Sequence, residues 1–271
     1  MRHRLLAATA LVATLSIGAT TGAYAADPSI WVSDSQGNIG LVDTVTGGVS
    51  QVNNTGHVLT DIGFVGTQLY GATFTDLYSV STATGAATHI GAFPGGGGGM
   101  NALVGNGTGL LGASNADMNL YSINPATAAT SVLKTGLPGT SAGDLAFAGG
   151  VLYASEIDGA TGLDMLVNAT TGTKIADFTG TVGGPANAVF GLAFTGGTMY
   201  AVQGTEVYSV NLLTAALAPL SNYGGHGLVD AFGAAVVGES APGPVPGTGL
   251  TGLVLLVLAG VAARSRGLFA R

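Results

Sequence analysis

Two short segments of this sequence combine a histidine with an aspartate at the same spacing. Residues 56–61 read Gly-His-Val-Leu-Thr-Asp, and residues 225–230 read Gly-His-Gly-Leu-Val-Asp. Imidazole and carboxylate groups are the side chains that a metal ion or a hydrolytic reaction requires. Within each segment the two residues are four positions apart, which is about 13 Å on an extended strand. Neither pair is therefore expected to bind one ion together unless its loop folds back.

A wider set of polar residues takes the same place in other parts of the chain. Asp61, Asp144 and Asp230 each begin a short apolar segment, and Asn101 and Gly191 stand at the corresponding position in two further segments. Such carboxylates could act as the acid and base of a hydrolase or as oxygen ligands of Ca²⁺. They could instead accept hydrogen bonds from the backbone of a neighbouring loop. Because repetition alone places these residues at one position, we favour the structural interpretation, and we interpret His57 and His226 as ordinary loop residues.

The repeat itself is carried by five hexapeptides with a β-branched first residue, a threonine at the fifth position and glycine or alanine at the sixth. They begin at Val42, Val80, Ile123, Val167 and Val210. The spacings are 38, 43, 44 and 43 residues, and a period near 43 is typical of a four-stranded propeller blade. Residues 26–240 have room for five such units. The turn motif is similar to the Asp/Asn-x-x-Thr-Gly turns of the β-propeller superfamily.

The units predict an all-β fold, a five-bladed β-propeller of four-stranded blades. The first unit lacks an inner strand, whereas the segment around residues 228–237 is an inner strand with no blade after it. We therefore expect the C-terminal strand to complete the N-terminal blade and close the ring. A β-sandwich or a β-solenoid is the alternative, but neither accounts for a five-fold register at this period.

This architecture gathers the candidate residues on one face. Loops that enter the inner strands and loops between the second and third strands lie on the same side of a propeller. That side therefore receives the candidate binding residues: Asp61, Asn101, Asp144, Asp230, His57 and His226. It also receives the glycine run 95–99 and further acidic residues.

The charge of the predicted domain limits its partners. Residues 26–240 contain two lysines, no arginine and 14 acidic residues, which gives a net charge of −12. Nucleic acids and phosphorylated substrates need cationic contacts, so this domain is a poor partner for them. The chain has no cysteine, which excludes disulfides and thiol chemistry. It also has no phosphate-loop or zinc-helix motif.

The N-terminus has the features of a secretory signal peptide. Arg2 and Arg4 precede an apolar stretch, and Ala23-Tyr24-Ala25 is a small-x-small cleavage motif. We expect residues 1–25 to be removed by cleavage after Ala25.

The C-terminus has three parts: a Pro/Gly-rich segment, an apolar run at 250–263 and a basic end with three arginines. This tail, residues 241–271, resembles the PEP-CTERM family of sorting signals, with Pro244-Val245-Pro246 where the family has Pro-Glu-Pro. The resemblance implies recognition and cleavage by an exosortase. It also implies a Gram-negative-type envelope, with the protein at the cell surface or in an exopolysaccharide matrix. A membrane helix would hold the chain before processing.

These observations together predict an exported, non-enzymatic binding or structural module whose partner is a surface polysaccharide or a protein. A carbohydrate-active hydrolase that uses the channel aspartates is the alternative, and a Ca²⁺-stabilised scaffold is a third possibility. No other cofactor is expected.

Overall fold

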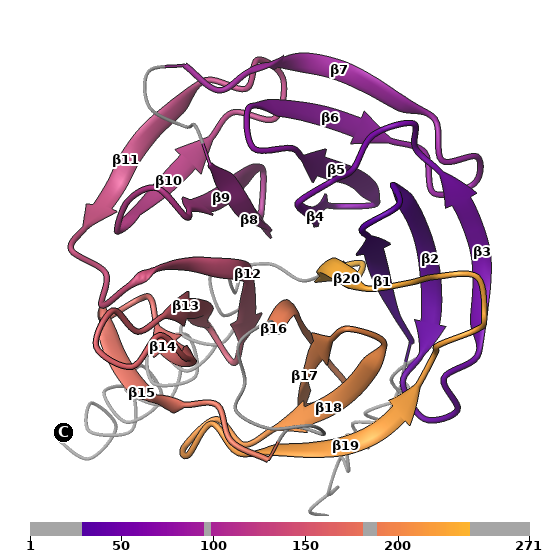
Figure 1. Cartoon of the computed structure of the whole chain (residues 1–271). Helices are drawn as coiled ribbons and strands as arrows, with labels where there is room; N and C mark the ends of the chain where they lie inside the picture. Colours follow the sequence, from indigo (N-terminus) through magenta and orange to yellow (C-terminus); the bar gives the residue numbers. More distant parts are fainter. Residues whose placement is uncertain (1–28, 95–98, 181–188, 239–271) are drawn as a thin grey trace, which may run out of the picture.

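The computed structural model describes residues 29–94, 99–180 and 189–238. The predicted signal peptide with Ala25, most of the glycine run and the tail with Pro244 and Pro246 lie outside these residues. The described chain forms twenty strands in five antiparallel four-stranded sheets, arranged as the blades of a five-bladed propeller (Figure 1). The prediction of an all-β, five-bladed propeller is confirmed. No helix among the described residues is long and apolar enough to cross a membrane.

The strands follow one another in sequence within each blade, apart from the first blade. Blade 1 consists of β20 (Ala231–Ala235), β1 (Ser29–Asp34), β2 (Asn38–Asp43) and β3 (Val49–Asn54). Blade 2 consists of β4 (Asp61–Val65), β5 (Gln68–Ala72), β6 (Asp76–Val80) and β7 (Ala87–Ala92). Blade 3 consists of β8 (Met100–Asn106), β9 (Gly109–Ser114), β10 (Asn119–Ile123) and β11 (Thr130–Thr135). Blade 4 consists of β12 (Thr140–Ala148), β13 (Val151–Ile157), β14 (Asp164–Asn168) and β15 (Thr173–Asp177). Blade 5 consists of β16 (Val189–Thr195), β17 (Thr198–Gln203), β18 (Glu206–Val210) and β19 (Leu217–Asn222).

The ring closes through β20, which pairs antiparallel with β1. Ala235 lies opposite Trp31 and Ala234 opposite Val32. The C-terminal strand thus supplies the inner strand that the N-terminal blade lacks, as the repeat predicted. Closure removes the free inner edge that blade 1 would otherwise expose.

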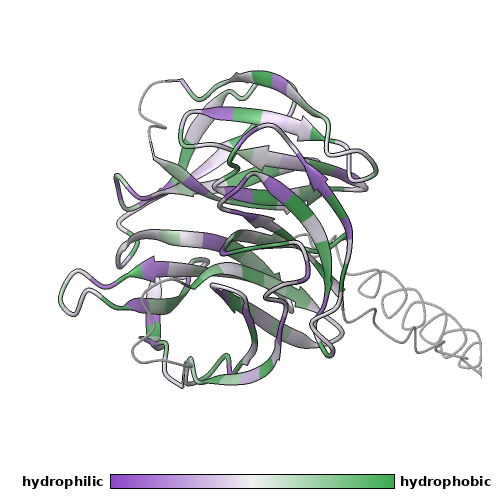
Figure 2. Ribbon diagram, turned by 45° about the vertical axis from the view of Figure 1, so that its right-hand side comes forward, coloured by the Kyte–Doolittle hydropathy of each residue, from purple (hydrophilic) through white to green (hydrophobic). Residues whose placement is uncertain are grey.

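Five hydrophobic clusters hold the blades together, and each lies between two neighbouring blades. The cluster between blades 5 and 1, for example, brings Tyr200 and Val202 against Ile30 and Val32. Figure 2 shows hydrophobic and hydrophilic residues alternating along several strands, which is the pattern of a sheet with differently exposed faces. The outer strands are the most exposed of each blade. The core therefore consists of blade-to-blade contacts, and it leaves the two ends of the channel to be closed by polar groups and loops.

The hexapeptides form the turns between the third and fourth strands. In all five, the carbonyl of the second residue accepts a hydrogen bond from the amide of the sixth. The sixth residue has a positive φ, from 54° to 78°. Glycine takes this conformation without steric cost. At Gly47 a side chain would also overlap the carbonyl oxygen of Asn222 in blade 5. We call the side with these turns the turn face and the opposite side the cup face.

Both ends of the described chain lie at the turn face. Ser29 at the start of β1 pairs with Asp43, which precedes a hexapeptide turn, and Ala235 at the end of β20 pairs with Trp31. Asp34, at the other end of β1, lies on the cup face with the start of β20. The loops that carry the candidate residues are therefore on the face opposite the chain ends.

Candidate functional site

The five inner strands place one residue each at an equivalent central position. This position is defined by its partner on the second strand of the blade: Ser33, Ala72, Ala113, Ser155 or Val202. The residues at it are Gly233, Asp61, Ala102, Asp144 and Gly191. All five are buried. The predicted equivalence is therefore right for Asp61, Asp144 and Gly191.

The equivalence predicted for Asn101 and Asp230 is wrong. Asn101 stands one residue before the central position, as Thr60 does in blade 2, and Asp230 stands three residues before it. The register of the inner strand shifts just before the central position in blades 1, 3, 4 and 5, so the shift itself does not set these two blades apart. Such a β-bulge adds an unpaired residue and turns the following side chains toward other faces. Asn101 is the bulged residue itself. Asp230 is exposed and precedes β20, three residues before Gly233.

Asp61 and Asp144 do not open into solvent, because both side chains are fully buried. Asp61 accepts hydrogen bonds from the amide of Ile62, at 2.6 Å, and from the amide of Leu103 on the inner strand of blade 3. Asp144 Oδ2 accepts hydrogen bonds from Leu192 N in blade 5 at 2.6 Å and from Ala234 N in blade 1 at 3.0 Å. The two carboxyl groups therefore link the inner strands of all five blades across the channel.

The two carboxyl groups are also hydrogen-bonded to each other. Burial raises the pKa of Asp61 well above its usual range, and the charge of Asp144 raises it further. Burial raises the pKa of Asp144 as well, while amide donors and the Asp61 side chain oppose this. Two buried carboxyl groups in contact are not both ionised readily, so the pair as a whole holds its protons to a higher pH than isolated aspartates do.

Small residues at the other central positions make room for this pair. A Cβ atom at Gly233 would overlap Asp61 Oδ1, and one at Gly191 would lie 3.0 Å from Ala234 Cβ. Ala102 is fully buried. The channel at this level therefore accommodates two carboxyl groups and no further side chain of that size.

Directly before the central position, the inner strands contribute a second ring of residues, one from each blade. They are Thr60, Asn101, Gly143, Phe190 and Phe232. All five line one cavity of about 240 Å³ at the cup face, together with Phe74, Asn115, Ser141, Ala142 and Ile157. We call this cavity the cup. None of the described residues that line it is charged.

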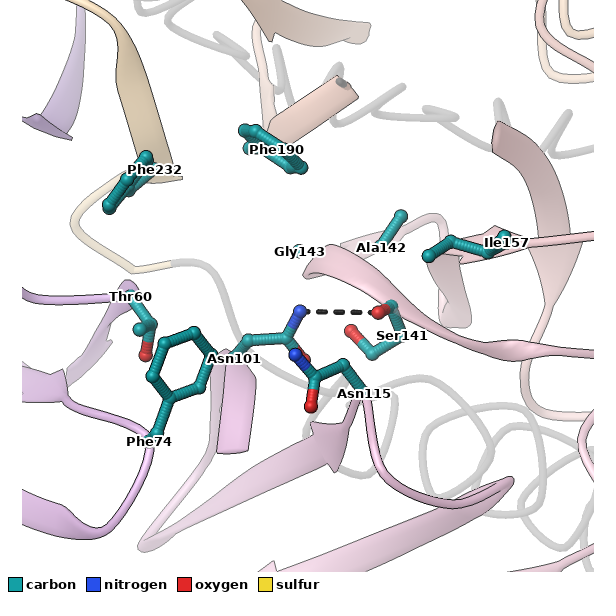
Figure 3. Close-up of a pocket in the computed structure, with 10 residues that line it drawn as sticks. All are labelled: Thr60, Phe74, Asn101, Asn115, Ser141, Ala142, Gly143, Ile157, Phe190 and Phe232. Atoms are coloured by element: carbon teal, nitrogen blue, oxygen red, sulfur yellow. Dashed lines mark hydrogen bonds between the residues drawn. The ribbon is translucent and has the colours of Figure 1, made fainter. Parts of the chain in front are cut away.

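In the cup, Phe190 and Phe232 lie on one side, and Asn101, Asn115 and Ser141 lie on the other together with the ring of Phe74 (Figure 3). The rings of Phe190 and Phe232 lie edge to face, with centroids 6.1 Å apart. Across from them, the Asn101 amide reaches toward Ser141 and donates to its carbonyl oxygen at 3.2 Å. Asn101 is 8% exposed and Ser141 2% exposed. Asn101 Oδ1 and Ser141 Oγ have no hydrogen-bond partner among the described residues. Because buried polar atoms are normally paired, both atoms have unused hydrogen-bonding capacity: Asn101 Oδ1 can accept, and the Ser141 hydroxyl can donate or accept.

A second cleft of about 520 Å³ adjoins the cup between blades 5 and 1. Phe190 and Phe232 line both cavities, so the two rings form a shared wall. The cleft contains the carboxylates of Asp230 and Glu206 and the amide of Gln203. Gln203 Oε1 is a third buried acceptor without a partner in the described structure. Asp230 is thus near the cup, although it does not occupy the channel.

The two predicted loop histidines lie apart from the cup lining. His57 is exposed and packs against Tyr78, with ring centroids 4.3 Å apart. His226 is exposed in the turn after β19, where its amide donates to the carbonyl of Tyr223. No group of three or more His, Asp or Glu side chains within the described ranges is placed to hold a metal ion.

The two phenylalanines are cup-lining residues that the sequence analysis did not single out. A signal was present, because Phe-Gly occurs at the same point of two repeats, at Phe190-Gly191 and Phe232-Gly233. In each case the glycine occupies the central position without a side chain, and the phenylalanine before it lines the cup.

Comparison with known proteins identifies the fold and no closer relationship. The chain matches no protein-family model and no curated protein. Among solved structures, a chain of a nidogen/laminin complex aligns over 78% of this chain and 99% of its own, with 11% identity and a TM-score of 0.50. Glutaminyl cyclase from Myxococcus xanthus aligns over 68% of this chain and 72% of its own, with 15% identity and a TM-score of 0.44. The chain spans 58% of the computationally designed Ika8 protein, with 15% identity and a TM-score of 0.34.

Proposed function

We propose that this chain is a non-enzymatic binding module and that the cup holds its ligand. The observation that supports this most strongly is the pair of unpartnered acceptors, Asn101 Oδ1 and Ser141 Oγ, facing aromatic rings in a cavity at the channel mouth. Binding sites of this kind combine an apolar wall with a few converging polar groups. The cup is small, so we expect one chemical group of a ligand to enter it.

The chemistry of the channel favours binding over hydrolysis. A glycoside hydrolase needs two carboxyl groups that contact the substrate. Asp61 and Asp144 have no exposed surface and are engaged with backbone amides of neighbouring blades. We therefore assign them to closing the ring beneath the cup.

A screen of small molecules tests the binding proposal. Saturation-transfer NMR with a panel of neutral sugars, amino acids, alkylamines and alcohols is expected to detect at least one ligand. Phe74→Ala should weaken the affinity of that ligand about tenfold, because this half-exposed ring lines the cup. A tenfold change corresponds to about 1.4 kcal/mol. Leu213→Ala is the matched control, since it removes an exposed apolar side chain from a hexapeptide turn on the turn face. Absence of any ligand, or equal binding by the Phe74 variant, would argue against the cup as the binding site.

We also propose that the protein is exported and sorted to the cell surface or an extracellular matrix. The signal-peptide features of residues 1–25 and the PEP-CTERM-like tail support this. The positions of the two described chain ends are compatible with this proposal. Both described ends leave the turn face, so a tail that is attached to an envelope would leave the cup pointing outward.

The intact mass of the protein purified from its own cells tests the export proposal. We expect a chain that starts at Ala26 and ends within the Pro/Gly-rich segment after residue 241. A mass that corresponds to residues 1–271 would refute the processing at both ends.

A further inference from the structure

The cup and the neighbouring cleft together point to a particular class of ligand. All three unpartnered side-chain atoms in these cavities can accept hydrogen bonds: Asn101 Oδ1, Ser141 Oγ and Gln203 Oε1. The charged groups of the cleft are the carboxylates Asp230 and Glu206. A complementary ligand therefore brings hydrogen-bond donors and positive charge.

The described domain supplies no cation of its own to this site. Its two lysines are on outer strands of blades 3 and 4. Lys134 donates to the carbonyl oxygens of Ala169 and Thr170. Lys174 forms ion pairs with Asp158 and, at 2.6 Å, with Asp177. The acidic groups of the cleft thus face solvent without an internal counter-charge from the described residues.

The aromatic wall suits an aliphatic cation. Phe190 and Phe232 separate the cup from the cleft and contribute to both linings. Ring faces attract ammonium groups and also pack against methylene groups.

We infer that the ligand is a short aliphatic diamine, or a chain that ends in such a group. One ammonium donates to Asn101 and Ser141 in the cup, the methylene chain runs along Phe190 and Phe232, and the second ammonium lies beside Asp230 and Glu206. This inference rests on the proposal that the cup is a binding site, and it specifies what binds there.

Matched probes separate charge from shape. Calorimetric titration of the wild-type protein at low salt is expected to show binding of 1,5-diaminopentane. Binding of 1-aminopentane should be weaker, and binding of 1,5-pentanediol at least about tenfold weaker, since the diol keeps the chain and the donors but not the charge. Added salt should weaken diamine binding because the cleft is open to solvent.

Variants locate the two halves of the site. Asp230→Asn should weaken diamine binding about fivefold, as expected for an exposed ion pair. Phe232→Leu should weaken it by a similar factor, because leucine keeps the apolar surface but has no ring. Asp43→Asn is the control, since it removes one charge from the turn face. Glu206→Gln provides a second test of the cleft if the Phe232 variant folds poorly.

The outcomes distinguish this inference from the proposed function. Two results would overturn the inference that the ligand is a diamine. One is equal affinity for the diol and the diamine, and the other is unchanged diamine binding by both the Asp230 and the Glu206 variants. If 1,5-diaminopentane does not bind but a sugar or amino acid binds in a Phe74-dependent manner, the cup remains the site and only the ligand class is wrong.

Discussion

Asp144→Ala is expected to lower the free energy of unfolding by about 4 kcal/mol, which is a large fraction of the roughly 5–15 kcal/mol that is typical of a domain. The substitution leaves the amides of Leu192 and Ala234 without the acceptor that they share on Asp144 Oδ2. It also removes the partner of Asp61. Each buried donor without a partner costs about 1–3 kcal/mol. Urea unfolding of the purified variant measures the loss.

Asp144→Asn is the matched control for this prediction. Its side-chain oxygen can still accept from Leu192 and Ala234, so we expect it to retain more than half of the stability that alanine loses. If both variants unfold at the same urea concentration as the wild type, the carboxyl pair does not hold the ring together. If both fold normally but abolish turnover of a polysaccharide, a catalytic role replaces the structural one.

The second large effect concerns pH: the free energy of unfolding is expected to fall as the pH rises from 5 to 8. Glu156 is 1% exposed, and burial raises its pKa to about 7, against the opposing effects of the Gly139 amide and Lys134. Between pH 4.5 and 7 the folded protein keeps this proton and the unfolded chain has lost it, so raising the pH favours unfolding. The loss is about 3 kcal/mol, at 1.36 kcal/mol for each pH unit of the interval. Asp61, with its raised pKa, contributes in the same direction.

Glu156→Gln tests this assignment, because glutamine imitates the protonated acid and can still accept from Gly139 N. The variant should lose most of the decline between pH 5 and 8 in urea unfolding experiments. Below about pH 4 both proteins should lose stability, since groups such as Asp76, whose pKa is lowered by Thr75 and His89, become protonated. A wild-type protein that gains stability from pH 5 to 8 would contradict the assignment.

The sequence was sufficient to predict the architecture because the turns of this fold repeat in sequence. A hexapeptide turn needs a residue with a positive φ at a fixed distance after a β-branched residue, and that requirement recurs in every blade. The closure by β20 followed from counting strands, since the first unit lacks an inner strand.

The site was harder to predict because it depends on register within the inner strands. The similarity between residues 56–61 and 225–230 suggested that Asp230 corresponds to Asp61, but the bulge at Phe232 places Gly233 in the channel instead. A single added residue in a strand reverses which side chains face inward. Bulges also precede Asp144 and Gly191, and the Phe-Gly pair at two of the bulges was the local sequence signal. Which carboxylates become buried was also hidden, because it depends on the small residues at Gly191 and Gly233 in other blades.

The most direct test of the cup as a binding site is an amide chemical-shift map of the isotope-labelled protein, titrated with the tightest ligand of the panel. The account predicts that the largest shifts come from Thr60, Asn101, Gly143, Phe190 and Phe232, with little change at the hexapeptide turns. Shifts that cluster at the turn face, with the ring of five unchanged, would contradict it.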